Sequence, residues 1–214
     1  MDKWTNALAR SLALGMGLLL LACTRPETLL PRSYVEWIED PQHGLRVEKT
    51  VDPLRFEIQY QPPAYLIAQE ERRESLPAAL VTERLAEFGS DLDYYQFRIA
   101  PATGQQNVLL RSARDEADYH RMVDYFSYAA QEDFYLLHGA DTARCVLYQF
   151  VRNYELTPHL EFALAFERKG EGDRTFVFDD QVLRVGAIKA NIEQQKINQL
   201  PKLKTRVCLK NRNS

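Results

Sequence analysis

Cysteine and histidine are scarce in this chain of 214 residues, and the common sequence motifs of catalysis are missing. Three cysteines and four histidines occur. None of these histidines has a second ligand-type residue at zinc spacing: His43, His120, His138 and His159. G-x-S-x-G, Walker, G-x-G-x-x-G and H-E-x-x-H patterns are absent as well. We therefore expect no metal and no cofactor, and serine hydrolase, ATP-binding, NAD-dependent and zinc protease activities have no positive support.

A long apolar run is also missing. The apolar run Ser11–Leu21 has eleven residues, and as a helix it would rise about 16 Å, roughly half of a 30 Å hydrocarbon core. We therefore expect no permanent membrane-spanning helix. The run follows a polar segment with Lys3 and Arg10 and ends at Ala22 and Cys23, which is the order of a secretory signal peptide.

The end of this segment carries a more specific pattern. Leu20-Leu21-Ala22-Cys23 resembles the lipobox of bacterial type II signal peptides. In such proteins lipid, typically including palmitate, is attached to the cysteine, and cleavage leaves that cysteine first. The resemblance implies that Cys23 anchors the mature chain without spanning the membrane, because two or three acyl chains make release negligible. An ordinary secretory signal, cut elsewhere, is the alternative.

The amino-acid composition limits the kinds of partner that can be expected. The formal charge is −3, and this mild acidic excess gives no reason to expect nucleic acid. Lipidation of Cys23 would leave Cys145 and Cys208 in a compartment where a disulfide can persist, although two free thiols are the favoured alternative. Neither the sequence nor its spacing fixes the oligomeric state.

The chain divides into four segments by pattern. Residues 1–22 are expected to be the signal peptide, and residues 23–32, with two prolines and no periodicity, a lipidated tether. Residues 33–200 have the length of one globular domain. Residues 201–214 form a basic tail: from Gln194 onward the chain has six basic residues and no acidic one. We expect this tail to add only weakly to membrane or partner attachment.

The first half of the domain mixes helical and strand periodicity. Tyr34, Trp37 and Ile38 have helical spacing, and Leu45–Tyr60 alternates as an antiparallel hairpin. Tyr65–Ala68 is compatible with strand or helix. A helix is expected from Pro77, with Val81, Leu85 and Phe88 on one face, followed by a strand over residues 92–99.

The second half is mostly strand after one helix. Ser112 and Asp115 suggest a capping box for a helix whose apolar stripe includes Met122 and Phe126. Strands are expected over residues 134–137, 143–154, 160–168, 175–178 and 182–192. No long helical pattern separates these strands, which favours an α+β class. We predict a single domain, a mainly antiparallel sheet with two or three helices packed on it.

Two carboxylate pairs and a set of tyrosines are the remaining candidates for chemistry. Asp91 with Asp93 and Asp179 with Asp180 have the residue types of a cation site or a glycosidase, but turn formation and solvated faces explain both pairs and are the favoured interpretation. Tyrosines at four positions offer a sugar-binding or partner-binding face, and a core edge is the simpler interpretation: Tyr94, Tyr95, Tyr125 and Tyr128. We assign no catalytic residue.

Short signatures along the chain resemble uncharacterised lipoproteins of Bacteroidota: YVEWIEDPQHGL, LRFEIQYQPPAYL, residues 118–158 and INQLPKLK. The resemblance implies a lipid anchor, with the outer membrane as the usual location and its face undecided, and it implies no activity. The leading hypothesis is a membrane-anchored envelope protein with a non-enzymatic interaction or structural role, whose partner is an unknown envelope protein or polysaccharide. The alternatives are a carbohydrate- or polymer-active enzyme using the paired carboxylates, and a chaperone-like assembly protein with an exposed apolar patch or edge strand.

Overall fold

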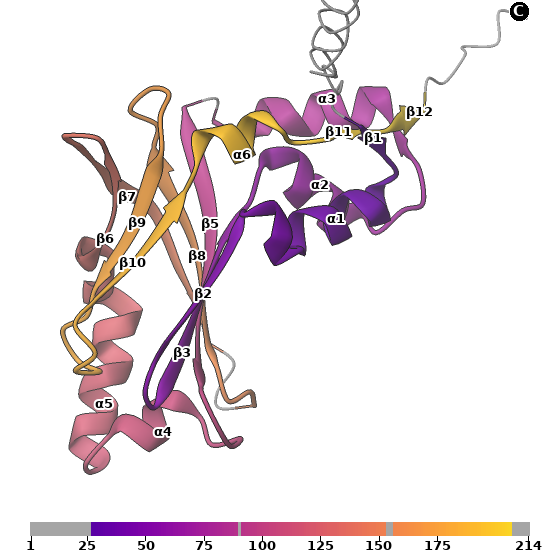
Figure 1. Cartoon of the computed structure of the whole chain (residues 1–214). Helices are drawn as coiled ribbons and strands as arrows, with labels where there is room; N and C mark the ends of the chain where they lie inside the picture. Colours follow the sequence, from indigo (N-terminus) through magenta and orange to yellow (C-terminus); the bar gives the residue numbers. More distant parts are fainter. Residues whose placement is uncertain (1–26, 90, 153–155, 207–214) are drawn as a thin grey trace, which may run out of the picture.

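Antiparallel strands form the body of the molecule in the computed structural model, which describes residues 27–89, 91–152 and 156–206. Cys23, Cys208 and the expected signal peptide lie outside these residues. Eight strands form one sheet in the order β10-β9-β6-β7-β8-β5-β3-β2 (Figure 1). Their bounds are β2 Arg46–Val51, β3 Leu54–Tyr60, β5 Leu92–Pro101, β6 Phe134–His138, β7 Asp141–Val151, β8 Leu160–Glu167, β9 Arg174–Asp179 and β10 Ala187–Ile192.

The sheet curls so strongly that its two halves face each other. Phe97 on β5 lies 5.3 Å from Phe178 on β9 and 5.4 Å from Phe134 on β6, measured between ring centroids. Yet β5 is separated from β6 and β9 by β8 and β7 in the strand order. The edge strand β10 also contacts β2 and β3. The inner face of the curled sheet is therefore the core, and it is built largely from aromatic side chains.

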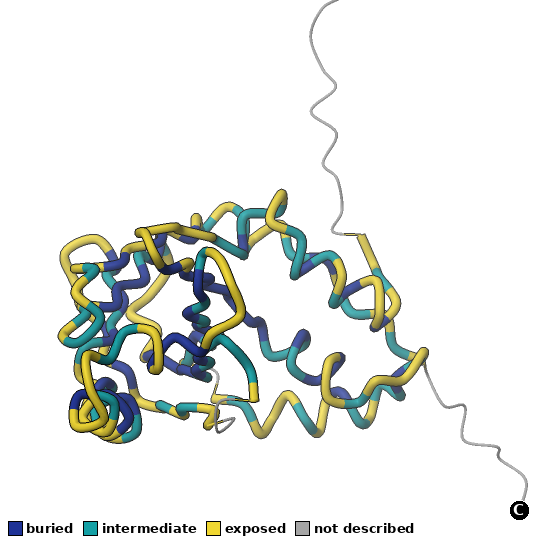
Figure 2. Tube along the Cα trace, turned by 90° about the horizontal axis from the view of Figure 1, so that it is seen from below, coloured by how far each residue is buried: buried dark blue, intermediate teal, exposed yellow. Residues whose placement is uncertain are grey.

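Alternation along each strand sets which residues enter this core. On β8, Phe162 and Phe166 are fully buried, whereas Glu161 is half-buried and Glu167 exposed on the outer face. This confirms the register expected from the sequence LEFALAFER, because successive side chains of a strand point to opposite faces. The tube in Figure 2 shows the same division, with buried residues on the strands and exposed residues on outer turns and helix surfaces.

Helices cover both ends of the sheet. At one end lie α1 Pro31–Glu39, α2 Pro63–Glu71 and α3 Ala78–Glu87; at the other lie α4 Val108–Ser112 and α5 Glu116–Asp124, while α6 Gln194–Asn198 follows β10 (Figure 1). Short 3-10 turns cover Pro41–His43 and Ala130–Asp133. The α+β class with a mainly antiparallel sheet is confirmed. The described residues contain six α-helices, more than the two or three expected.

Several local predictions need correction. Ser112 does not start the long helix: it ends α4, and Asp115 caps α5 by accepting a hydrogen bond from the Asp118 amide at 2.7 Å. The helical stripe continues from α5 into a π-helical turn, Tyr125–Ala129, which buries Phe126. The last long strand begins at Ala187 rather than Val182, because the preceding residues form a loop around the carboxylate of Asp180.

The two ends of the described chain are paired with each other. Residues Thr28–Leu29 form β1, which pairs in parallel with β11, Lys202–Leu203. The next two-residue strand, β12 at Thr205–Arg206, pairs with β4 at Leu76–Pro77. Segments assigned from sequence to the tether and to the basic tail thus take part in the fold. Within the described residues, no helix is both long and apolar enough to cross a membrane.

Candidate functional site

The first predicted carboxylate pair is divided between the interior and the surface. Asp93 lies on the inner side of β5 and is fully buried. Its carboxylate accepts hydrogen bonds from Arg174 Nε at 2.6 Å and from Arg168 Nε at 2.9 Å. Asp91 lies just before β5, and its backbone carbonyl accepts a hydrogen bond from the Arg168 backbone N–H at 2.7 Å. Asp93 is therefore the centre of a buried ion-paired cluster and has no exposed surface with which to touch a substrate.

Titratable rings surround this cluster. The Tyr60 hydroxyl donates to Asp93 at 3.4 Å, and burial, with the neighbouring Asp93 charge, raises the pKa of Tyr60 to about 12. Burial likewise raises the pKa of Tyr95 well above its usual value and lowers the pKa of His138. Among the described residues, neither the Tyr95 hydroxyl nor either ring nitrogen of His138 has a hydrogen-bond partner. Burial therefore favours the neutral form of each of these three rings.

The second pair stabilises a loop. Asp180 accepts backbone hydrogen bonds from Val182 at 3.0 Å, Leu183 at 2.7 Å and Val185 at 2.9 Å. Asp179 is exposed at the end of β9. Because the Asp180 oxygens are occupied by three amides, this carboxylate holds residues 181–186 in a bend and delays the start of β10. The turn-forming interpretation of this pair fits the geometry.

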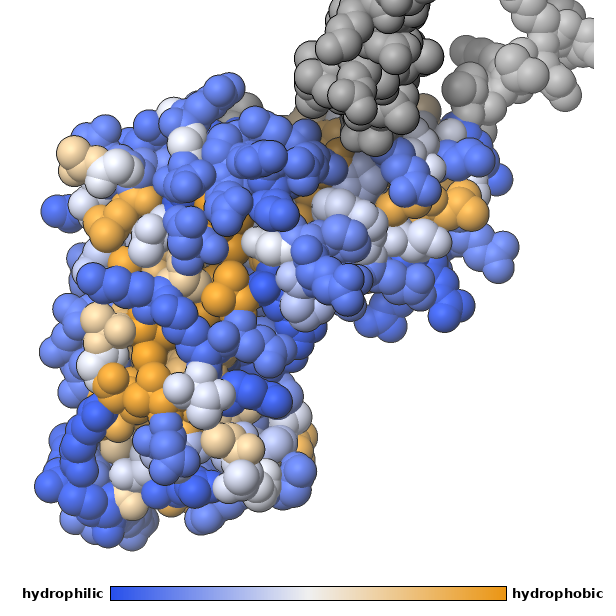
Figure 3. All heavy atoms as spheres, in the orientation of Figure 1, coloured by the Kyte–Doolittle hydropathy of each residue, from blue (hydrophilic) through white to orange (hydrophobic). Residues whose placement is uncertain are grey.

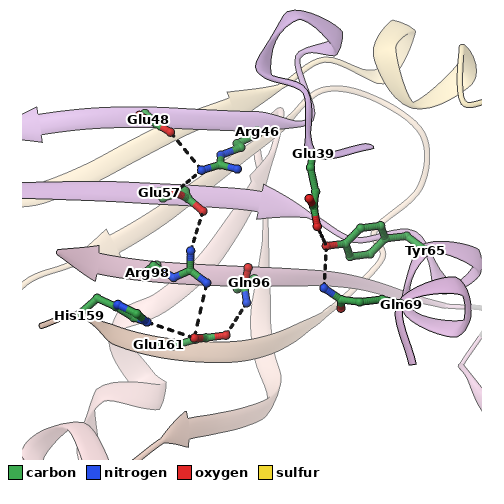
Figure 4. A network of polar contacts seen from close by, with 10 residues as sticks. All are labelled: Glu39, Arg46, Glu48, Glu57, Tyr65, Gln69, Gln96, Arg98, His159 and Glu161. Atoms are coloured by element: carbon green, nitrogen blue, oxygen red, sulfur yellow. Dashed lines mark hydrogen bonds and ion pairs between the residues drawn. The ribbon is translucent and has the colours of Figure 1, made fainter. Parts of the chain in front are cut away.

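A different set of polar residues gathers on the outer face of the sheet (Figure 4). Glu57 on β3, Arg98 on β5 and Glu161 on β8 occupy one row, since Glu57 pairs with Arg98 and Arg98 with Glu161 in the strand register. Arg98 lies 3.4 Å from Glu57 and 3.6 Å from Glu161. Arg46 extends the row by binding Glu57 at 2.5 Å and Glu48 at 3.2 Å.

This row borders a small pocket of about 190 Å³, lined by Arg55, Glu57, Arg98, Ala100, Pro101, Gly104, Gln105, Pro158 and His159. His159 Nε2 lies 3.6 Å from a Glu161 oxygen. Ligand pockets for drug-sized molecules usually measure about 300–1,000 Å³. The pocket therefore has room for one small group and not for an extended sugar chain.

The spacing of Glu57 and Glu161 merits comparison with a glycosidase. Two strand spacings, about 10 Å, separate their backbones; in inverting enzymes the two carboxyl groups themselves lie about 6.5–9.5 Å apart. In those enzymes the sugar bond and a water molecule lie between the two carboxylates. Here Arg98 lies between Glu57 and Glu161 in the strand register, and its guanidinium contacts both carboxylates. The arrangement is an ion-pair ladder across three strands.

No sequence motif marks this row. Its members are separated by 41 and 63 positions along the chain and meet only through strand pairing. The sequence indicates only that each of these residues occupies an outward-facing position in a strand with alternating polarity. Combining the correct strand order with the register would have placed them together.

The histidines are dispersed. His43 stacks on Trp37 with ring centroids 3.8 Å apart, and its Nδ1 lies 2.8 Å from the Trp37 carbonyl oxygen. His120 is exposed beside Glu116, His138 is buried near the Asp93 cluster and His159 is at the outer-face pocket. In the described ranges, no three or more His, Cys, Asp or Glu side chains are placed to hold a metal ion.

The tyrosines do not form one face. Tyr94 and Tyr95 point to opposite sides of β5; Tyr95 is in the core, while the Tyr94 ring packs edge-on against Phe88 at 5.5 Å. Tyr125 donates to Asp133 at 2.7 Å, and Tyr128 is 82% exposed. A continuous tyrosine platform for sugar is therefore not assembled from these four residues.

The described cysteine is a buried thiol. Cys145 is 8% exposed and free, and its Sγ donates to the Leu147 carbonyl at 3.1 Å. Burial raises the pKa of this thiol to about 12, so the reactive thiolate is rare at neutral pH. The possible partner Cys208 lies outside the described residues.

Exposed apolar residues gather on β7. Val146, Leu147 and Val151 are each more than a third exposed, and Leu147 follows a bulge that interrupts the pairing with β8. Figure 3 shows apolar side chains on another part of the surface, over the half of the sheet that contains β9 and β10. Contiguous exposed apolar patches often mark surfaces that contact other molecules.

Comparison with known proteins gives little further guidance. No protein-family model matches the chain, and no curated protein matches its sequence. A crystal structure of a protein of unknown function from Burkholderia pseudomallei is similar over 81% of this chain and 94% of that chain, with 11% sequence identity and a TM-score of 0.35. Similarity at this level carries no inference about the role of the present chain.

Proposed function

We propose that this chain is a lipid-anchored protein of the bacterial cell envelope, attached through Cys23 to the outer membrane, with a non-enzymatic binding or structural role. The signal-like segment and the lipobox-like residues before Cys23 support the anchor. The partner is an envelope protein or polysaccharide, and the exposed apolar residues of β7 are a surface available for such contacts.

The observation that carries the non-enzymatic role is the position of Arg98. In the outer-face row the guanidinium of Arg98 contacts the carboxylates of both Glu57 and Glu161, whereas a glycosidase holds its substrate between two carboxylates. The carboxylates predicted from sequence are also engaged: Asp93 by two arginines, and Asp180 by three backbone amides. In these contacts, the carboxylates of Asp93 and Asp180 stabilise the fold.

A hydrolysis assay tests this role against the carbohydrate- or polymer-active alternative. The full chain is incubated with peptidoglycan and with envelope polysaccharide, and newly released reducing ends are measured. We expect the wild type to release no more than a Glu57→Gln/Glu161→Gln double variant. The control variant is Glu48→Gln, which changes an exposed carboxylate of the same row. Release by wild type and Glu48→Gln that disappears in the double variant would establish the enzyme and overturn the proposal.

A further inference from the structure

The basic end of the chain lies beside the start of the domain. The Lys202 amide donates to the Glu27 carbonyl at 2.8 Å, and the Lys204 amide donates to the Leu29 carbonyl at 2.7 Å. Residues 28 and 29 are also in parallel register with residues 202 and 203. Positions some 175 residues apart in sequence are thus held within hydrogen-bonding distance.

The side chains of this end form a charged stripe. Lys202, Lys204 and Arg206 are exposed, whereas Leu203 and Thr205 between them are half-buried. Alternation along extended backbone places the three basic groups on one side of the chain, and Leu203 packs on the core on the other side. None of the three forms an ion pair with another described residue. The adjoining segment Glu27–Leu29 contributes one carboxylate, so basic groups outnumber acidic ones along these two paired segments.

Chain length limits how far this stripe can be from the lipid. Only five residue steps separate Cys23 from Thr28, and a fully extended chain covers at most about 3.6 Å per residue. Thr28, which pairs with Lys202 at the start of the stripe, therefore lies within about 18 Å of the attachment residue. Bacterial membranes expose phosphate groups, and basic side chains are attracted to an anionic surface within a Debye length, about 8 Å at physiological salt.

We propose that Lys202, Lys204 and Arg206 contact the anionic headgroups of the membrane that holds the anchor, and so orient the domain on it. This rests on the proposed lipid attachment at Cys23. The lipid retains the protein, and the basic stripe sets which end faces the bilayer. The end that carries α1, α2 and α3 then lies at the membrane, and the end that carries α4 and α5 points away from it (Figure 1).

A fluorescence measurement on the full-length gene product tests the orientation. The chain has two tryptophans, Trp4 and Trp37. Cleavage before Cys23 removes Trp4, so the mature protein keeps Trp37 as the donor on α1, which packs against β11. The protein purified from membranes is reconstituted into vesicles of phosphatidylcholine alone or with phosphatidylglycerol, each containing dansyl-labelled phosphatidylethanolamine. Energy transfer from Trp37 to the headgroup dansyl reports how close this end lies to the surface.

We expect more energy transfer in the anionic vesicles than in the neutral ones. The difference should be lost in Lys202→Glu/Lys204→Glu and should shrink as salt shortens the Debye length from about 30 Å at 0.01 M to about 3 Å at 1 M. The matched control is Lys49→Glu/Lys189→Glu, which reverses two exposed lysines on the edge strands β2 and β10 and should keep the difference.

Equal transfer in both vesicle types, or equal loss in the two double variants, would overturn the orientation proposal. The mass of the same purified protein shows separately whether lipid is attached at Cys23. Failure of the anchor and failure of the orientation are therefore distinguished: lipidated protein without charge-dependent transfer contradicts only the latter.

Discussion

Arg174 donates to the fully buried carboxylate of Asp93 at 2.6 Å, although 81 residues separate them in sequence. Arg174 begins β9 and Asp93 lies near the start of β5, on opposite halves of the curled sheet. Arg168, just after β8, completes the cluster. The ion pairs thus join the two halves of the sheet at one end of the aromatic core.

Asp93→Asn should strongly destabilise the fold. Removing the charge leaves two arginines facing each other, one of them 3% exposed, and breaking a buried pair costs about 3–5 kcal/mol. Denaturant unfolding measures the free energy. Glu167→Gln is the control, because its ion pair with Lys169 is exposed and a change of at most about 1 kcal/mol is expected. Equal effects of the two substitutions would mean that the cluster contributes little.

Phe162 tests the aromatic core in the same way. Its ring lies 5.0 Å from that of Phe150 and 5.5 Å from that of Phe126, and Phe162→Ala should cost about 3–5 kcal/mol. Glu161→Ala, one position earlier, loses partly exposed ion pairs with Arg98 and His159 and a hydrogen bond from Gln96, so a smaller loss of stability is expected. Thermal melts compare the two variants. A Glu161→Ala protein as unstable as Phe162→Ala would contradict the strand register.

Asp118 gives a prediction for acid stability. Hydrogen bonds from the side chain and the backbone of Arg114 hold the pKa of Asp118 well below its usual range. The pKa of Asp118 is lower in the folded state than in the unfolded state. Ionised Asp118 therefore contributes its full stabilisation of the fold above the unfolded-state pKa of about 3.9, and this stabilisation is lost as pH falls through the folded-state pKa. Below about pH 4, the Tm of the wild type should therefore decrease more steeply with falling pH than the Tm of Asp118→Asn. The control is Glu116→Gln, which changes an exposed carboxylate on the same helix and should keep the wild-type slope of Tm against pH. A wild-type slope in Asp118→Asn as well would show that ionisation of Asp118 does not stabilise the fold.

Local patterns in the sequence predicted much of the fold, and contacts distant in sequence account for what they missed. Alternation in residues 160–167 fixed the buried face of β8, because the period of a strand is local information. The segment Tyr65–Ala68 stayed undecided as a short apolar run, and the structure places it in α2, which begins at Pro63. Asp115, rather than Ser112, became the helix cap because residues 113 and 114 leave helical geometry.

The candidate site was less accessible to prediction. The sequence drew attention to Asp93 as an acid near a strand, but its two arginines lie 75 and 81 residues away. The row of Glu57, Arg98 and Glu161 depends on three strands meeting in register. The parallel pairing of Thr28 with Lys202 joins the two ends of the domain, and no local pattern encodes such a contact.

Metabolic labelling with a palmitate analogue tests the lipid anchor most directly. Cells producing the wild type, Cys23→Ala and Cys208→Ala are labelled, and incorporation into the protein is measured alongside its recovery in the membrane fraction. We predict label and membrane recovery for the wild type and for Cys208→Ala, and loss of label with an uncleaved or mislocalised precursor for Cys23→Ala. Equal label on the wild type and Cys23→Ala would contradict the assignment of Cys23 as the lipid attachment residue.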